Sequence, residues 1–169
     1  MTERCPMSDA GFAKRLVVRP PRPGDMGWIV SRHGALYSSE YGWDDRLEAL
    51  TAEIVADYLR KHDPLRENCW IAERQGENVG CVMLVAETND IARLRLLLVE
   101  PTARLVEEAV RFAHRAHYSK ITLWTHSVLT AARRIYDRAG FTLVATKEHA
   151  EFGKKLLGET WELELTASR

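Results

Sequence analysis

The sequence predicts an α/β domain in which a mixed central sheet of about seven strands is flanked by about four helices. Three observations predict this class. Short segments have the apolar pattern of strands, four longer segments repeat apolar residues at helical spacing, and one helical segment lies between two central strand segments. Strands joined through a helix pair in parallel, whereas strands joined by a tight turn pair antiparallel, so the sheet should be mixed.

The first third of the chain is expected to hold one edge strand and two helices. Residues 16–19 form a short β-type run that ends in prolines, which cannot donate to a strand ladder. Apolar residues then recur at helical intervals over 26–38 and over 46–61. Between them, residues 37–45 (YSSEYGWDD) are rich in aromatic and turn-forming residues, which predicts a loop.

The centre of the chain predicts a β-hairpin followed by a third strand. Two strand-like runs, 69–73 and 79–86, are joined by a polar link that contains Gly76. Residues 91–99 first alternate between polar and apolar side chains and then become wholly apolar. This change is expected where a strand enters a sheet that is covered on both faces.

The remaining elements alternate between helix and strand before two final strands. They are predicted in the order helix, strand, helix, strand, strand at 102–118, 121–124, 128–138, 141–146 and 160–165. Gly140 stands where a left-handed residue would end the last helix. Residues 147–159 are predicted to be the link between the last two strands.

Length and charge limit the domain organisation and the partners. A chain of 169 residues suits one domain, and we expect a flexible segment over 1–15 and a single domain over 16–169. Lysine plus arginine and aspartate plus glutamate number 24 each, so the summed charge gives no general attraction to nucleic acid or to a membrane surface. We expect neither as a partner.

Cysteine and histidine usage predicts a reducing compartment and no metal. The three cysteines are odd in number and lack C-x-x-C spacing, which favours free thiols. No segment resembles a signal peptide or is long and apolar enough to span a bilayer, so a cytoplasmic location is expected. His114 and His117 have helical spacing without a carboxylate partner, and no metal site is predicted from them.

Residues 121–141, ITLWTHSVLTAARRIYDRAGF, resemble the last third of the GNAT superfamily of acyl-CoA-dependent N-acyltransferases, where a strand leads into a helix that ends in Tyr-x-x-x-Gly-Phe. The segments HGALYSSEYGW, ARLRLLLVEPTAR and ETWELEL extend the resemblance over about 17–165. This wider pattern is similar to the acetyltransferase half of bacterial proteins that fuse a MarR-type helix-turn-helix to a GNAT domain. It implies a GNAT-like fold and transfer of an acetyl group from acetyl-CoA to a primary amine of a small molecule or peptide.

The resemblance also implies a coenzyme site. The strand over 94–99 would splay from the strand over 121–124 and leave a wedge for acetyl-CoA. The residues implied in binding it are Leu97, Leu98, Val99, Arg104, Leu105, Ser127 and Arg133. For Arg133, a surface ion pair with Asp137 competes equally.

The resemblance implies that Tyr136 is the general acid to the departing CoA thiolate. The alternative is a structural role, in which its ring packs beneath Phe141 and its hydroxyl meets a backbone carbonyl. Three glutamates, Glu40, Glu87 and Glu100, are candidates to accept the proton of the amine, and Glu40 is the first choice. The alternative is that Glu40 is an exposed loop residue with no catalytic role.

The resemblance implies an acceptor site at the end of the first helix. The residues expected to bind the amine substrate are His33, Tyr37, Tyr41 and Trp43. A lone histidine on an amphipathic helix can instead be structural or solvated. The three aromatic residues can alternatively form a patch through which a homodimer assembles.

The sequence departs from the family where the coenzyme pyrophosphate is expected. GNAT enzymes hold this group in a loop with the pattern Arg/Gln-x-x-Gly-x-Gly/Ala, whose backbone N–H groups face the phosphates. Here VEPTAR (99–104) leads directly into RLVEEAVRFA, as though a glycine run had been removed. The alternative function is therefore a catalytically impaired relic that senses a ligand or binds a protein partner.

Overall fold

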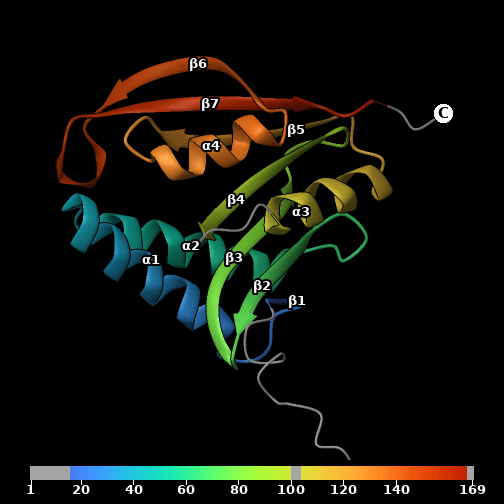
Figure 1. The fold of residues 1–169 in the computed structure, drawn as a ribbon, viewed down its shortest axis with the longest axis horizontal. Coiled ribbons are helices and arrows are strands. Elements are labelled where there is room, and N and C mark those ends of the chain that lie inside the picture. The colour runs from blue at the N-terminus through green and yellow to red at the C-terminus, as the bar shows by residue number, and fades with distance from the viewer. Residues whose placement is uncertain (1–15, 100–103, 167–169) are drawn as a thin grey trace, which may run out of the picture.

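The computed structural model describes residues 16–99 and 104–166, and these build one sheet with the strand order β1-β2-β3-β4-β5-β7-β6 (Figure 1). The strands are β1 (Val17–Arg19), β2 (Asn68–Arg74), β3 (Glu77–Ala86), β4 (Ile91–Val99), β5 (Lys120–His126), β6 (Thr142–His149) and β7 (Leu156–Glu164). The helices are α1 (Asp25–Tyr41), α2 (Arg46–Lys61), α3 (Arg104–Arg115) and α4 (Thr130–Arg138). The predicted fold class is confirmed.

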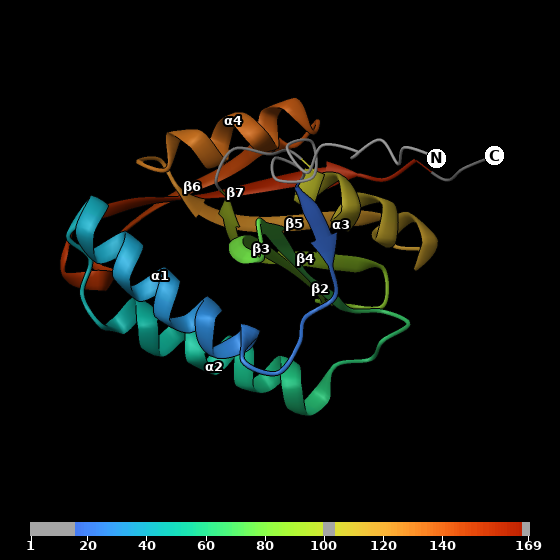
Figure 2. The same ribbon diagram turned by 60° about the horizontal axis from the view of Figure 1, so that its bottom comes forward.

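The helices cover both faces of the sheet. Figure 2 shows α1 and α2 on one side, with α3 and α4 on the other. One buried cluster joins the sheet to α3 and α4 and includes Leu105, Ile121 and Phe141. A second joins it to α1 and α2 and includes Ile29 and Val55. This two-sided cover explains why the central strands carry long apolar runs.

The parallel strands β4 and β5 pair along only part of their length. Their register runs from Ile91 opposite Lys120 to Leu94 opposite Leu123. Beyond this point β4 continues to Val99 and β5 to His126 without pairing to each other, and Figure 1 shows the two strands separating. The expected wedge is therefore present after Leu94.

A β-bulge reshapes β4 within the wedge. Cys81 faces Leu98 and Met83 faces Arg95, so β4 carries one more residue than β3 between these pairs. Leu96 adopts a positive φ of 52°, and its carbonyl accepts a hydrogen bond from the Cys81 thiol at 3.1 Å. Such a bulge re-aims neighbouring side chains and backbone groups, which here belong to the wall of the wedge.

Two predicted loops were partly wrong. Helix α1 continues to Tyr41 and ends at Gly42, which has a left-handed φ of 64° and donates its N–H to the helix end, so Glu40 and Tyr41 are helical. The link over 147–159 is largely strand, because β6 and β7 stay paired out to His149 opposite Leu156. A short 3₁₀ turn over Glu151–Gly153 connects them.

Two other boundaries bear on the site. Helix α3 begins at Arg104 among the described residues, and the predicted start at 102 lies outside them, as does the segment over 1–15. Helix α4 begins at Thr130 rather than 128. Within 16–99 and 104–166, no helix has the length and apolar composition needed to cross a membrane.

Candidate active site

A cavity of about 410 Å³ lies where α1 and α2 meet the ends of β4 and β5. Seven of its lining residues carry an aromatic or imidazole ring, so we call it the aromatic cavity. It is lined by His33, Tyr37, Trp43, Leu47, Leu50, Thr51, Ile54, Arg93, Leu94, Arg95, Leu96, Leu97, Trp124, Thr125, His126, Leu129, Ala132, Tyr136, Glu151 and Phe152. Its volume suits a small molecule.

A second cavity of about 500 Å³ lies between α1, α4 and the end of β4. We call it the strand-end cavity. It is lined by Trp28, Arg32, Leu36, Tyr37, Glu40, Tyr41, Glu77, Asn78, Val79, Leu97, Leu98, Leu129, Ala131, Ala132 and Ile135. Tyr37, Leu97, Leu129 and Ala132 belong to both walls, so the two cavities meet beside the bulge of β4.

Tyr136 lies on α4 and lines the aromatic cavity. Its ring packs against Phe141 and Trp161, with centroids 5.9 and 6.3 Å away. Within the described part of the chain its hydroxyl makes no hydrogen bond, so the backbone-carbonyl contact of the structural alternative is not found. Burial raises the pKa of Tyr136, and nearby Tyr37 adds to this effect, so the phenol stays protonated at neutral pH.

His33 and Tyr37 lie one helical turn apart on α1 and stack with ring centroids 5.8 Å apart. The Nδ1–H of His33 donates to the Ile29 carbonyl at 2.8 Å, which leaves Nε2 as an unprotonated acceptor. Burial lowers the pKa of His33 to about 4, so the ring is neutral at physiological pH. His33 therefore presents a lone pair without a charge.

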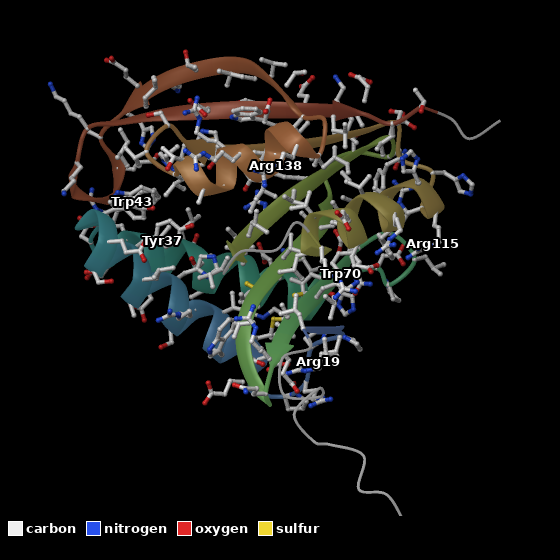
Figure 3. All side chains as sticks on the ribbon, in the orientation of Figure 1. Arg19, Tyr37, Trp43, Trp70, Arg115 and Arg138 are labelled. Atoms are coloured by element: carbon white, nitrogen blue, oxygen red, sulfur yellow. The ribbon has the colours of Figure 1, made fainter. Side chains whose placement is uncertain are left out.

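Trp43 closes one end of the aromatic cavity. Figure 3 shows Tyr37 and Trp43 together, where the end of α1 approaches the β6–β7 turn. The Trp43 ring stacks on Phe152 at 5.1 Å and meets the edge of His126 at 4.8 Å. Because Trp43 is only 3% exposed, it forms no part of an exposed dimer patch. Tyr41, at the helix end, lines the strand-end cavity.

The structure does not bring Glu40 to the aromatic cavity. Its exposed side chain lies in the last turn of α1 and borders the strand-end cavity. Glu87, the second candidate base, is bound by Arg93 and accepts the Thr122 hydroxyl at 2.5 Å, and Glu100 lies outside the described residues. A catalytic role for Glu40 stays a prediction.

The predicted coenzyme residues occupy three places. Leu97 and Leu98 line the strand-end cavity, and Leu98 is buried beside the bulge. Val99 ends β4, while Arg104 and the buried Leu105 begin α3 across the link 100–103, whose structure lies outside the described residues. The N–H groups that open a helix have no partner within it, and this end carries partial positive charge.

Ser127 and Arg133 are engaged with the sheet. The backbone N–H of Ser127 donates to Leu157 at 3.0 Å. The Nε of Arg133 donates at 2.9 Å to Glu159, a buried carboxylate that also accepts from Trp161. This contact replaces the ion pair with Asp137 that the sequence suggested, and a coenzyme contact for either residue stays a prediction.

Sequence reasoning missed several residues of the aromatic cavity. Arg93 and Arg95 alternate along β4, and Trp124 and His126 alternate along β5, so their shared face was the available signal. His126 pairs with His149 at 3.0 Å between the two Nε2 atoms, and burial lowers the pKa of His126 to about 4. Phe152 gave no such signal, because it lies in a turn.

No group of three histidine, cysteine, aspartate or glutamate side chains within 16–99 and 104–166 is arranged to hold a metal ion. Within those ranges, the ionisable side chains of the aromatic cavity are two phenols, two neutral imidazoles, two guanidinium groups and the carboxylate of Glu151.

The sheet opens between the parallel strands β4 and β5, helices cover both of its faces, and the phenol of Tyr136 lines the cavity at the opening. The chain belongs to the acetyltransferase (GNAT) family, whose model matches residues 34–141. The resemblance to MarR-type fusion proteins in particular stays a prediction.

Similar proteins agree with this assignment. The chain is 33% identical over 88 residues to N-acetylaspartate synthetase of Xenopus tropicalis, and the match spans 47% of this chain and 32% of that protein. The ribosomal-protein-alanine N-acetyltransferase of Brucella melitensis matches with a TM-score of 0.70, at 14% identity over 88% of this chain and 99% of that one. The Salmonella typhimurium protein yncA, solved with its cofactor acetyl-CoA, matches with a TM-score of 0.68, at 19% identity over 90% and 95%. These structural matches show the shared fold.

Proposed function

We propose that this protein transfers an acetyl group from acetyl-CoA to a primary amine by direct attack of the amine. The observation that carries the proposal is the meeting of two cavities where β4 leaves β5. An acyl donor in the strand-end cavity and an amine in the aromatic cavity would come together beside Leu97. Holding both reactants in this way removes much of the entropic cost of their encounter.

The residues around the opening fit acetyl-CoA. Beyond Leu94, β4 is not paired with β5, so backbone groups on that edge are free to bind the amides of a pantetheine arm. The start of α3 at Arg104 offers partial positive charge for phosphates. Bound acetyl-CoA would supply an acetyl group activated as a thioester.

Tyr136 would serve the departing sulfur. A phenol in water has a pKa near 10 and a thiol a pKa of about 8.5, and burial raises that of Tyr136 further. Complete proton transfer before the C–S bond breaks is therefore unfavourable. Tyr136 would instead donate a hydrogen bond to the sulfur as negative charge develops. As the C–S bond breaks and the C–N bond is complete, the sulfur would take the phenolic proton and the phenol would regain the proton that the attacking nitrogen loses, so that the products are the amide and the CoA thiol.

His33 would orient the amine. The attacking nitrogen must be neutral and needs its lone pair aimed at the acyl carbon. The Nε2 atom of His33 can accept one N–H of this amine, because its Nδ1–H is already committed to the Ile29 carbonyl. With a pKa of about 4, His33 adds no positive charge that would repel an ammonium group as it enters.

A second candidate function rests on the sequence of the link between β4 and α3. Residues 100–103 (EPTA) contain no glycine, so this link lacks the pattern with which the family binds pyrophosphate. A non-catalytic domain that senses a ligand or binds a protein partner is the function that this departure favours.

Calorimetric titration of acetyl-CoA, followed by thiol detection with a panel of amines, separates the two candidates. The proposed enzyme binds acetyl-CoA at micromolar concentration and releases thiol only when an acceptor is present. A dissociation constant in the millimolar range, with no amine-dependent thiol release, would support the non-catalytic domain instead.

A further inference from the structure

Arg95 is a half-buried cation of the aromatic cavity that has no partner among the residues that the structure describes. It lies on β4 immediately before the bulge and lines both the aromatic cavity and a third cavity beside α2. Within 16–99 and 104–166 its guanidinium makes no hydrogen bond and no ion pair, although the group carries five N–H donors. Burying such a group without a partner is costly.

The two carboxylates that act on the pKa of Arg95 already have other partners. Glu87 is bound by Arg93 and by the Thr122 hydroxyl. Asp57 pairs with Lys61 at 3.0 Å. These two acidic groups act on Arg95 only at longer range, and burial, with like-charged Arg93 nearby, lowers its pKa.

Other acidic groups beside Arg95 do not neutralise it either. Glu67 accepts the backbone N–H groups of Ala86 and Asp63, at 2.9 and 3.2 Å. Glu53 lines the third cavity but lies beyond ion-pair distance of Arg95. The protein therefore holds these carboxylates away from the guanidinium rather than against it.

The charges in the aromatic cavity favour an anion over a second cation. Arg93 and Arg95 are positive, His33 and His126 are neutral because burial lowers the pKa of each to about 4, and Glu151 is mostly exposed. A polyamine would bring further positive charge toward Arg95, whereas Glu87 already pairs with Arg93. An acceptor with a negative group would satisfy the guanidinium and gain Coulomb energy in a partly desolvated site.

We infer that the acceptor is a small amine that carries a carboxylate, which the guanidinium of Arg95 binds while the amine faces the acetyl group. A carboxylate matches the planar fork of arginine through two parallel hydrogen bonds. Arg93 is already neutralised by Glu87, so one cation remains, and it matches a monoanion better than the −1.5 to −2 charge (roughly) of a phosphate monoester. This inference deepens the proposed function and rests on it.

The test compares matched amines that differ only by a carboxylate: glycine with methylamine, β-alanine with ethylamine, and γ-aminobutyrate with propylamine. We expect the carboxylated member of at least one pair to have the higher kcat/KM. Arg95→Gln should lower that kcat/KM about 10- to 100-fold, as expected for loss of a charged hydrogen bond, and leave the other member unchanged. Arg111→Gln, at an exposed arginine of α3 that pairs with Glu108, is the matched control and should change neither kcat/KM value.

Two results overturn the inference. The first is an equal kcat/KM for both members of every pair. The second is a higher kcat/KM for phosphoethanolamine than for the carboxylated amines, if Arg95→Gln abolishes this preference. If no amine is acetylated, the proposed function fails, and titration of the three amino acids by nuclear magnetic resonance still decides the inference. Binding that Arg95→Gln abolishes supports the carboxylate site, whereas binding that is absent or independent of Arg95 contradicts it.

Discussion

The β1–β2 edge of the sheet and the opening between β4 and β5 differ in how their buried polar side chains are hydrogen-bonded. At the edge, Arg19 donates to Asp25 at 2.7 Å, to Glu73 at 2.6 Å and to Asn78 at 2.9 Å. At the opening, Arg95 and the Tyr136 hydroxyl have no hydrogen-bond partner within the residues that the structure describes.

The pKa directions express the same difference. Hydrogen bonds to Asp25 and Glu73 raise the pKa of Arg19, and the bond from Arg19 is the main reason that the pKa of Asp25 falls to about 2. Burial instead lowers the pKa of Arg95 and raises that of Tyr136, which in both cases disfavours the charged form. A saturated cluster stabilises the fold, while unsatisfied groups at an opening are available to a ligand.

The largest effect is expected from Tyr136→Phe. Because the hydroxyl has no partner in the described protein, its loss should leave the urea midpoint and the affinity for acetyl-CoA unchanged. Turnover at saturating acetyl-CoA should fall about 100-fold or more, as expected when a proton donor is lost. Thiol release and urea unfolding measure the two quantities.

Tyr118→Phe is the matched control for Tyr136→Phe. The Tyr118 hydroxyl donates to the Arg66 carbonyl at 2.9 Å. Its removal should cost about 1 kcal/mol of unfolding free energy and leave turnover intact. Unchanged turnover in Tyr136→Phe would remove the proposed role of that phenol.

Arg19→Met should lower stability without lowering turnover, the opposite of Tyr136→Phe. The substitution leaves Asp25 and Glu73 without their main partner in a mostly buried cluster, so the free energy of unfolding should fall by about 3 kcal/mol. Turnover of the folded protein should not change. Arg111→Met removes an exposed pair and should shift stability by no more than about 0.5 kcal/mol. Equal stability of both variants would contradict the contrast between the two regions.

A smaller effect on the free energy of unfolding is expected when the pH is lowered. The folded-state pKa of Asp25 is about 2, below its ordinary value of 3.8, so its contribution to stability is complete above about pH 4 and is lost as the pH falls toward 2. In Asp25→Asn, the loss of unfolding free energy between about pH 4 and pH 2 should be smaller by on the order of 1 kcal/mol. Urea unfolding at several pH values between 2 and 6 measures it. An unchanged slope in the variant would show that other carboxylates dominate.

The fold was predictable because local apolar periodicity specified nearly every element. The errors fall where that signal is weak. Residues 37–41 look like a loop, yet they extend α1 until Gly42 supplies a left-handed end. Residues 147–149 and 156–159 look polar and glycine-containing, yet they form strands because each pairs with the other across the turn.

The candidate site was predictable only in part. Tyr136, His33, Tyr37 and Trp43 were found through the resemblance, and all four line the aromatic cavity. In the sequence, Arg93 and Arg95 are equivalent alternating residues. Only the tertiary structure shows that Glu87 pairs with Arg93 and that Arg95 has no carboxylate partner among the described residues. Likewise, His126 meets His149 only because β5 and β6 flank β7.

Amide hydrogen exchange with and without acetyl-CoA tests the central claim most directly, because it reports on both regions of the sheet at once. We predict that saturating acetyl-CoA slows exchange in residues 95–98 of β4 and leaves residues 17–19 of β1 and 71–73 of β2 unchanged. If exchange over 95–98 stays the same at millimolar acetyl-CoA, or slows equally at the β1–β2 edge, the opening between β4 and β5 is not the acetyl-CoA site.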